Sequence, residues 1–181
     1  DATRLVKLRA GEIHIATAVG PAPDRRPFIV QSNNGTIRAL GTRFTVRQED
    51  KLIDAHTHVA VTQGAVEIRP VHAWQSLRVV AAGQQASFNS NGSTVLEELD
   101  KYADAWVNGV LYADNTPLNT IVSQIARYRS GIVRCDPAIA DLRVSGAFQL
   151  KDSDNILALL QKSLPIRVHR RTRYWISIEP A

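Results

Sequence analysis

The segment from Gly35 to Arg47 has the clearest alternation of apolar and polar side chains in the chain. Each of its halves begins at a glycine, and Ile37, Phe44 and Val46 alternate there with polar residues. Because successive side chains of a strand point to opposite faces, this pattern predicts two half-buried strands separated by a glycine turn.

Similar alternating segments, several of which begin at a glycine, recur from Leu5 to about Phe88 with uneven spacing. They predict an all-β domain over residues 1–93, with irregularly stacked strands arranged as a distorted solenoid or a sandwich. The polar stretch from Asn89 to Thr94 is the best candidate for its boundary. After it, apolar residues recur at spacings of three and four, which predicts an amphipathic helical linker over residues 94–106. These residues are Val95, Leu96, Leu99, Tyr102, Ala103 and Trp106.

Residues 107–181 have the pattern of two strand-helix-strand units. In the first unit, a strand at residues 110–112 leads to a helix with Thr116 as N-cap and Pro117 at the first helical position, and a strand follows at residues 132–135. In the second unit, a strand at residues 142–150 leads to a helix capped by Asp152 or Ser153, which Pro165 ends.

A hairpin of residues 166–169 and 174–178 closes the sequence around an arginine-rich turn. With both helices covering one face of the strands, residues 107–181 are expected to form a small α+β domain.

The motif Gly-Thr-Arg-Phe-Thr-Val at residues 41–46 resembles a motif of the FecR family of bacterial transmembrane sigma-factor regulators. Further segments similar to that family follow in its order over nearly all of residues 5–180. They are the opening strand Leu8–Ile15, Arg26-Pro27-Phe28, Gln63–Ile68, Ala82-Gly83-Gln84, Trp106–Tyr112, Asn115–Leu118, Arg127-Tyr128 and Val144–Phe148. The second half also resembles the short domain shared by secretins and the N-termini of TonB-dependent transporters.

The FecR resemblance implies a cell-surface signalling role. In that family, a periplasmic C-terminal region senses the N-terminal signalling domain of an outer-membrane TonB-dependent siderophore transporter. One transmembrane helix carries the signal to a cytoplasmic domain that controls a sigma factor and thereby transcription of iron-transport genes. The resemblance therefore implies the periplasmic portion of a single-pass inner-membrane protein of a Gram-negative bacterium.

Two parts of that family architecture, the sigma-binding domain and the membrane helix, have no counterpart in this sequence. The chain begins at Asp1 and contains no methionine, so we expect an excised piece of a longer protein. No run of about eighteen apolar residues occurs in it. Contacts with the sigma factor and with the membrane are accordingly expected from segments outside this sequence.

The residues give little sign of catalytic or metal chemistry. His56 and His58 share a face of a predicted strand, and the parity of Val59 and Val61, which suits the buried face, leaves both histidines in solvent. Cys135 is the only cysteine, so the chain can form no intrachain disulfide, and it is expected to be a small buried apolar residue. Neither a nucleophile elbow nor a phosphate-binding glycine motif occurs. We therefore predict no enzyme activity, no catalytic residue, no metal and no cofactor.

A binding module is the best interpretation, with a sheet edge in residues 107–181 as its contact surface. The formal net charge of +5 comes mostly from arginine, and only residues 169–173 are locally dense in it. This cluster is expected either to be a solvated turn or to steer an acidic partner. The predicted partner-binding residues are Leu142, Val144, Phe148, Ile166, Val168, Arg170, Arg171, Arg173 and Trp175.

Two alternatives remain open from the sequence. A nucleic-acid-binding module would use the arginines together with Tyr174 and Trp175 as a basic patch with stacking aromatics. A glycan-binding domain or cell-envelope enzyme would need a cleft with convergent carboxylates or aromatics in the β-rich half. The signalling interpretation includes no nucleic-acid partner.

Overall fold

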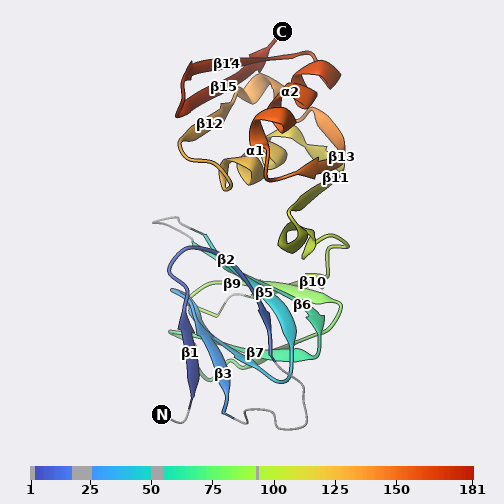
Figure 1. Ribbon diagram of the computed structural model, residues 1–181. Coiled ribbons are helices and arrows are strands. Elements are labelled where there is room, and N and C mark those ends of the chain that lie inside the picture. Colours follow the sequence, from blue (N-terminus) through green and yellow to red (C-terminus); the bar gives the residue numbers. More distant parts are fainter. Residues whose placement is uncertain (1–2, 18–25, 50–54, 93) are drawn as a thin grey trace. The chain divides into compact units, whose positions relative to one another are not determined.

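The computed structural model describes residues 3–17, 26–49, 55–92 and 94–181 (Figure 1). Two compact units divide the chain between Asp104 and Ala105. We call them the β unit, residues 1–104, and the α+β unit, residues 105–181. No described helix is long and apolar enough to cross a membrane.

The described part of the β unit folds into two five-stranded sheets, in the orders β1-β3-β4-β7-β8 and β10-β9-β6-β5-β2. The strands are β1 (Arg4–Lys7), β2 (Gly11–Ala16), β3 (Phe28–Gln31), β4 (Gly35–Ala39), β5 (Arg43–Gln48), β6 (Thr57–Gln63), β7 (Ala65–Pro70), β8 (Arg78–Ala81), β9 (Gln84–Phe88) and β10 (Thr94–Glu98). Alternate residues of both sheets, including Ile37, Phe44, Val61 and Ile68, are buried in one apolar core. Of the two predicted arrangements, the sandwich is the one formed.

Hairpins of consecutive strands alternate between the two sheets, since β3–β4 and β7–β8 lie in one sheet and β5–β6 and β9–β10 in the other. The chain crosses between sheets at Gly41, Gly64 and Gly83, all of which have positive φ. These crossings stack: the Ala82 N–H donates to the Gly64 carbonyl at 2.8 Å. A Cβ at Gly64 would overlap the carbonyl oxygen of Gly41. Glycine is therefore needed at Gly64 both for its backbone conformation and for space.

A buried polar cluster, Ser32, Asn34, Gln48 and Thr57, ties the two sheets together. The Thr57 hydroxyl on β6 lies 2.9 Å from both Ser32 Oγ and Gln48 Oε1. The Asn34 amide donates to Thr57 Oγ1 at 3.1 Å and to the Ala55 carbonyl at 2.9 Å. The turn between β3 and β4 is thus hydrogen-bonded to β5 and β6 of the opposite sheet.

Two expectations for the β unit are wrong. The expected opening strand Leu8–Ile15 begins only at Gly11, as β2, because residues 8–10 connect β1 in one sheet to β2 in the other. The expected helix over residues 94–106 is replaced at its start by β10, which pairs with β9 from Thr94 opposite Phe88. The exposed edge of β9 offers hydrogen bonds to an extended partner, and this pairing outweighs the local helical periodicity. The β unit therefore extends past the expected boundary at residue 93.

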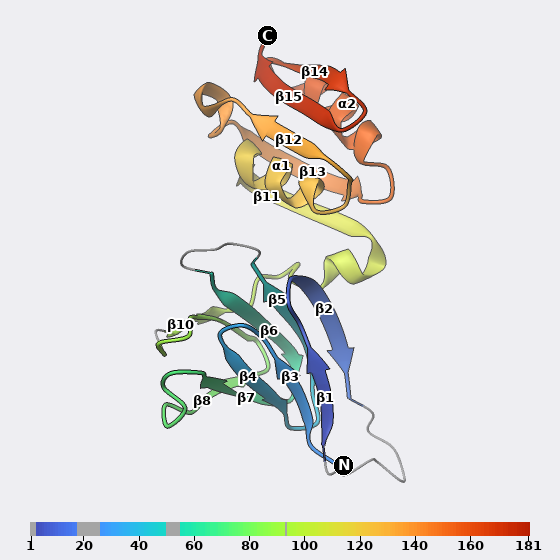
Figure 2. The same cartoon turned by 90° about the vertical axis from the view of Figure 1, so that its left-hand side faces the viewer.

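The α+β unit contains two helices and two small sheets among its elements (Figure 2). They are η1 (Ala105–Asn108), β11 (Val110–Pro117), α1 (Leu118–Ala126), β12 (Ile132–Cys135), η2 (Pro137–Ile139), β13 (Arg143–Gln149), α2 (Ser153–Ser163), β14 (Ile166–Thr172) and β15 (Trp175–Pro180). β11 pairs antiparallel with β13. The other sheet has the order β12-β15-β14, with β12 parallel to β15.

The helices lie between these sheets, since α1 packs against β12, β11 and β13, and α2 packs against β14 and β13. The expectation that both helices cover one face of the strands is therefore wrong. Their apolar stripes face sheets on two sides, and Leu118, Ile121, Ile125 and Leu157 are completely buried.

The predicted helix caps have different outcomes. Asp152 is the N-cap of α2, and its side chain accepts a hydrogen bond from the Asn155 N–H at 3.0 Å. Thr116 is not the N-cap of α1, because β11 continues to Pro117. The first N–H groups of α1 instead donate to the carbonyls of Leu142 and Ala140, so no side-chain cap is needed.

Candidate partner-binding surface

The apolar residues predicted to contact a partner are mostly core residues of the α+β unit. Val144, Phe148 and Ile166 are buried in it, and Leu142 and Val168 pack against it while partly exposed. The three buried side chains cannot make contacts on the surface as the unit is folded. Their strands could offer a partner only backbone groups.

The three predicted arginines differ in their environments. Arg170 and Arg171 belong to β14, and only Arg173 lies in the turn before β15. Arg170 Nη2 is 3.4 Å from Asp154 Oδ1 on α2, and the same oxygen accepts a hydrogen bond from Arg129 at 3.0 Å. The Arg129 hydrogen bond is the main cause that lowers the pKa of Asp154, and the charge of Arg170 adds to it. Arg170 is therefore paired with a carboxylate of α2, on the side of β14 that faces the helices.

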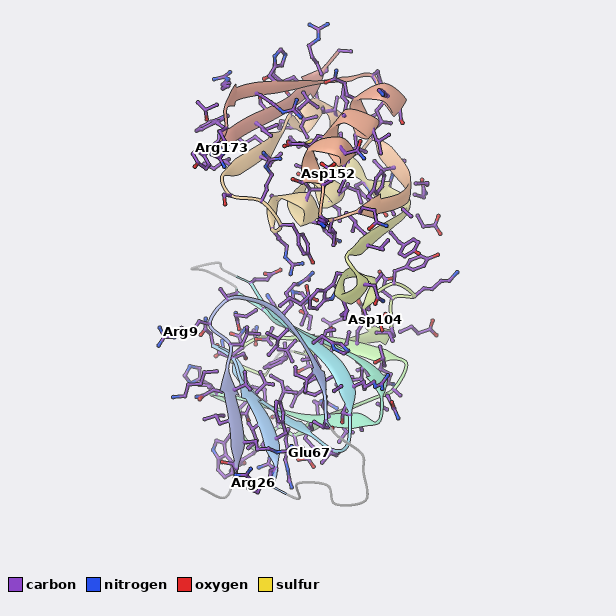
Figure 3. The ribbon with its side chains drawn as sticks, in the orientation of Figure 1. Arg9, Arg26, Glu67, Asp104, Asp152 and Arg173 are labelled. Carbon is purple, nitrogen blue, oxygen red and sulfur yellow. The ribbon has the colours of Figure 1, made fainter. Side chains whose placement is uncertain are left out.

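Trp175 lies on the opposite face of the three-stranded sheet, which faces away from the helices. Its neighbour on β12 is Ile132, which is 48% exposed, and Tyr174 beside it is 57% exposed. The Arg134 guanidinium stacks over the Trp175 ring, with its carbon 5.3 Å from the ring centroid. Arg173, which is labelled in Figure 3, similarly stacks over Tyr174, with its guanidinium carbon 5.7 Å from the ring centroid.

We call the set Ile132, Arg134, Arg173, Tyr174 and Trp175 the aromatic-basic face. The sequence reasoning missed Ile132 and Arg134. Their parity along β12 could have indicated an outward orientation, since Val133 and Cys135 pack against the core. Nothing in the local pattern of residues indicated that β12 pairs with β15.

Glu179, an acidic side chain on the same outer face, already has partners within the α+β unit. Glu179 Oε2 lies 3.6 Å from His169 Nε2, and Glu179 Oε1 accepts a hydrogen bond from the Ser177 hydroxyl at 2.8 Å. Arg134 and Arg173 are not paired with this carboxylate. The aromatic-basic face therefore suits a partner that brings negative charge.

The histidine and cysteine candidates have structural surroundings. His58 Nε2 is 3.1 Å from Glu49 Oε1, and burial, with the charge of Arg47, lowers the pKa of His58 in spite of Glu49. Cys135 is half-buried, and burial raises the pKa of its thiol. Among the described residues, no three His, Cys, Asp or Glu side chains gather as metal ligands.

A shallow hollow of about 430 Å³ lies on the outer face of the sheet that contains β3, β4 and β7. Arg38, Arg69 and Glu67 line it together with Pro27, Ile29 and Thr36. Glu67 is its one carboxylate among these residues and pairs with Arg38 at 3.5 Å. This lining lacks the pair of convergent carboxylates that glycoside hydrolysis requires.

Comparisons with known proteins agree with the sequence resemblance. Residues 1–67 match the family model described as FecR protein. The chain is also similar to two crystal structures of a candidate anti-sigma factor from Parabacteroides distasonis ATCC 8503, solved at 2.50 and 1.65 Å resolution. Each match covers 100% of this chain and 82% of the chain in the crystal structure. Their sequence identities are 24% and 25%, with TM-scores of 0.72 and 0.73. No curated protein sequence matches the chain. The matched residues 1–67 contain the Gly-Thr-Arg-Phe-Thr-Val motif, so the family model agrees with the FecR resemblance of the sequence, and the two neighbours share the fold of the whole chain.

Proposed function

We propose that this chain is the periplasmic signal-receiving region of an inner-membrane sigma-factor regulator. Its α+β unit binds the N-terminal signalling domain of an outer-membrane TonB-dependent siderophore transporter, and the outcome controls iron-uptake transcription. The match of residues 1–67 to the FecR family model supports the regulatory role. The observation that supports the location of the contact is the aromatic-basic face.

Exposed aromatic and arginine side chains are the residue types that dominate binding energy in protein interfaces. Tyr174 and Trp175 are held in place by arginines that stack on their rings. A side chain that is already ordered loses less conformational entropy when a partner binds. The face is therefore preorganised for a protein contact.

Arg171 and Arg173 retain the steering role expected from the sequence, because both are exposed. Arg170 contributes less, since Asp154 offsets its charge. Steering by exposed charges acts mainly on the association rate and weakens with salt.

Calorimetry against purified signalling domains of several TonB-dependent transporters from the source organism tests the proposal. We expect one domain to bind and Trp175→Ala to weaken its binding by about thirtyfold, as for an interface hot spot. Trp74→Ala is the matched control, because Trp74 is 65% exposed in the β unit and should leave affinity unchanged. Binding to none of the domains would refute the proposal, and a loss on Trp74→Ala alone would move the site to the β unit.

A kinetic measurement tests the steering role separately. Replacing Arg171 and Arg173 by glutamate should slow association and reduce its dependence on salt. Arg78→Glu on β8 is the control, since Arg78 is exposed on the β unit. An unchanged rate in the double variant would make the arginines ordinary solvated residues.

A further inference from the structure

The three-stranded sheet of the α+β unit ends in two edge strands, β12 and β14. An edge strand presents backbone N–H and C=O groups that a partner strand can pair with. This is the basis of binding by strand addition. The two edges differ in how many of these groups the protein already uses.

The edge of β14 is largely closed. The outward N–H of Val168 donates to the Gln161 side chain of α2 at 2.8 Å. The N–H of Ile166 donates to the Leu164 carbonyl, also at 2.8 Å. The pairing with β15 then shifts between Arg170 and Thr172, which marks a bulge. Occupied donors and a bulge both hinder the addition of a strand.

The edge of β12 is open. The Ile132 N–H donates to the carbonyl of Tyr174, the residue before β15, at 2.7 Å, and the N–H of Asp136, the residue after β12, donates to the Ile178 carbonyl of β15 at 2.9 Å. In a parallel pair, alternate residues bond to the neighbour, so the N–H and C=O of Val133 and Cys135 point away from β15. No hydrogen bond joins these four groups to another described residue.

We propose that the partner adds an extended segment to the β12 edge, where it pairs with the backbone of Val133 and Cys135. The inference rests on the proposed function and names the strand that receives the signalling domain. The segment carries an acidic side chain opposite Arg134 and an apolar one against Ile132 and Trp175. The aromatic-basic face adjoins this edge, so backbone pairing and side-chain recognition act on the same segment.

The two-stranded sheet offers a competing edge on β13. Its exposed side chains include Ser145, Ala147 and Gln149, which are small or polar. Its pairing with β11 is irregular between Ala113 and Thr116. The β13 edge therefore offers a partner less side-chain area and no stacked aromatic residue among these positions.

Amide hydrogen exchange of the whole chain, free and bound to the signalling domain identified by calorimetry, tests the assignment. The amides of Val133 and Cys135 should exchange fast in the free chain and slow by about tenfold or more when bound, as for newly paired backbone groups. The Val168 amide should change little. Protection confined to Val168 and Arg170, or to Ala147 and Gln149, would overturn the assignment to β12 and leave the proposed function standing.

Substitutions give a second measurement. Val133→Pro removes an N–H that the fold does not use, and Arg134→Glu reverses the charge beside the edge; each should weaken binding by about tenfold or more. Two controls should leave the affinity within about twofold: Gln161→Ala, which removes the acceptor of the Val168 N–H at the β14 edge, and Arg167→Glu, on β14 at the same face.

If Val133→Pro does not fold, Arg134→Glu and the exchange pattern still test whether the partner binds at β12. Unchanged affinity in Arg134→Glu would contradict the proposal, and a wild-type chain that binds no signalling domain would overturn the proposed function and this assignment together.

Discussion

The cores of the two units are built from different chemistry. Among its described residues, the β unit buries six polar side chains beside its apolar core: Ser32, Asn34, Thr42, Thr45, Gln48 and Thr57. All the buried residues described in the α+β unit are apolar. The free energy of folding should therefore depend on buried side-chain hydrogen bonds as well as apolar packing in the β unit, and mainly on apolar packing in the α+β unit.

Register explains the difference. Hairpins with the same alternation stack along the β unit, and a strand that slipped by one residue would turn its apolar face outward. Hydrogen bonds such as that from Thr42 Oγ1 to the Ala65 carbonyl, at 2.6 Å, have a low energy at only one register. In the α+β unit, the apolar stripe of each helix determines which of its sides is buried against the sheets, so buried polar side chains are not needed to set the register.

The largest expected effect breaks the apolar core of the α+β unit. Leu157→Ala removes a completely buried side chain of α2 and should lower the free energy of unfolding of that unit by about 2–5 kcal/mol. Hydrogen exchange resolved by segment measures this loss. Leu159→Ala is the control, because Leu159 is 42% exposed on the same helix. Equal loss of protection in the β unit would show that the two units do not fold separately.

A crossing between the sheets of the β unit provides the next test. Gly64→Ala places a side chain at φ +76° against the Gly41 carbonyl and should cost about 2 kcal/mol or more. Gly83→Ala has a similar φ of +82° with open space around it and should cost about 1 kcal/mol. Thermal unfolding of both variants measures the difference. Equal losses would mean that the overlap with Gly41 relaxes at no cost.

Removing one hydroxyl tests the polar cluster. Thr57→Val keeps the shape of the side chain but removes the hydroxyl that Asn34, Ser32 and Gln48 share, and should destabilise the β unit by about 1–3 kcal/mol. Thr62→Val, on the same strand but with an exposed hydrogen bond, should cost less. Denaturant unfolding compares the two variants. A stable Thr57→Val protein would show that apolar packing alone holds the sheets together.

A smaller effect follows from the lowered pKa of His58 in the β unit. As the pH falls through about 6.5, the unfolded chain binds a proton that folded His58 resists, so the stability of the β unit decreases. His58→Gln should flatten this dependence between about pH 7 and pH 5. Melting curves across this range measure it. An equally steep dependence in the variant would assign the effect to other groups.

The smallest effect belongs to the α+β unit at lower pH. Asp154 has a lowered pKa, so its contribution is present above its unfolded value of 3.8 and is lost as the pH falls below it. The side chain is 62% exposed, and the contribution should be below about 1 kcal/mol. Asp154→Asn should remove it, as measured by acid titration of stability. A loss of stability near pH 6 in the α+β unit, without one in the β unit, would contradict the assignment of these two pH ranges to Asp154 and His58.

The sequence by itself determined most local structure. Alternation around Phe44 and Val46 predicted their strand, and the Asp152 cap and the apolar stripe of residues 156–160 predicted α2. The family motif was equally local, and the buried Thr42 hydroxyl now accounts for part of it. Such features could be predicted because side-chain periodicity and capping depend on neighbours along the chain.

Tertiary structure decided one strand of the β unit and most of the candidate site. Residues 94–98 form β10 because they pair with the edge of β9, although the spacing of their apolar residues is helical. Ile132 and Arg134 reach Trp175 through the parallel pairing of β12 with β15, and Arg170 reaches Asp154 because α2 packs beside β14. Strand pairing and helix packing join residues far apart in sequence, so which residues meet depends on the free energy of the whole fold and cannot be inferred from any one segment.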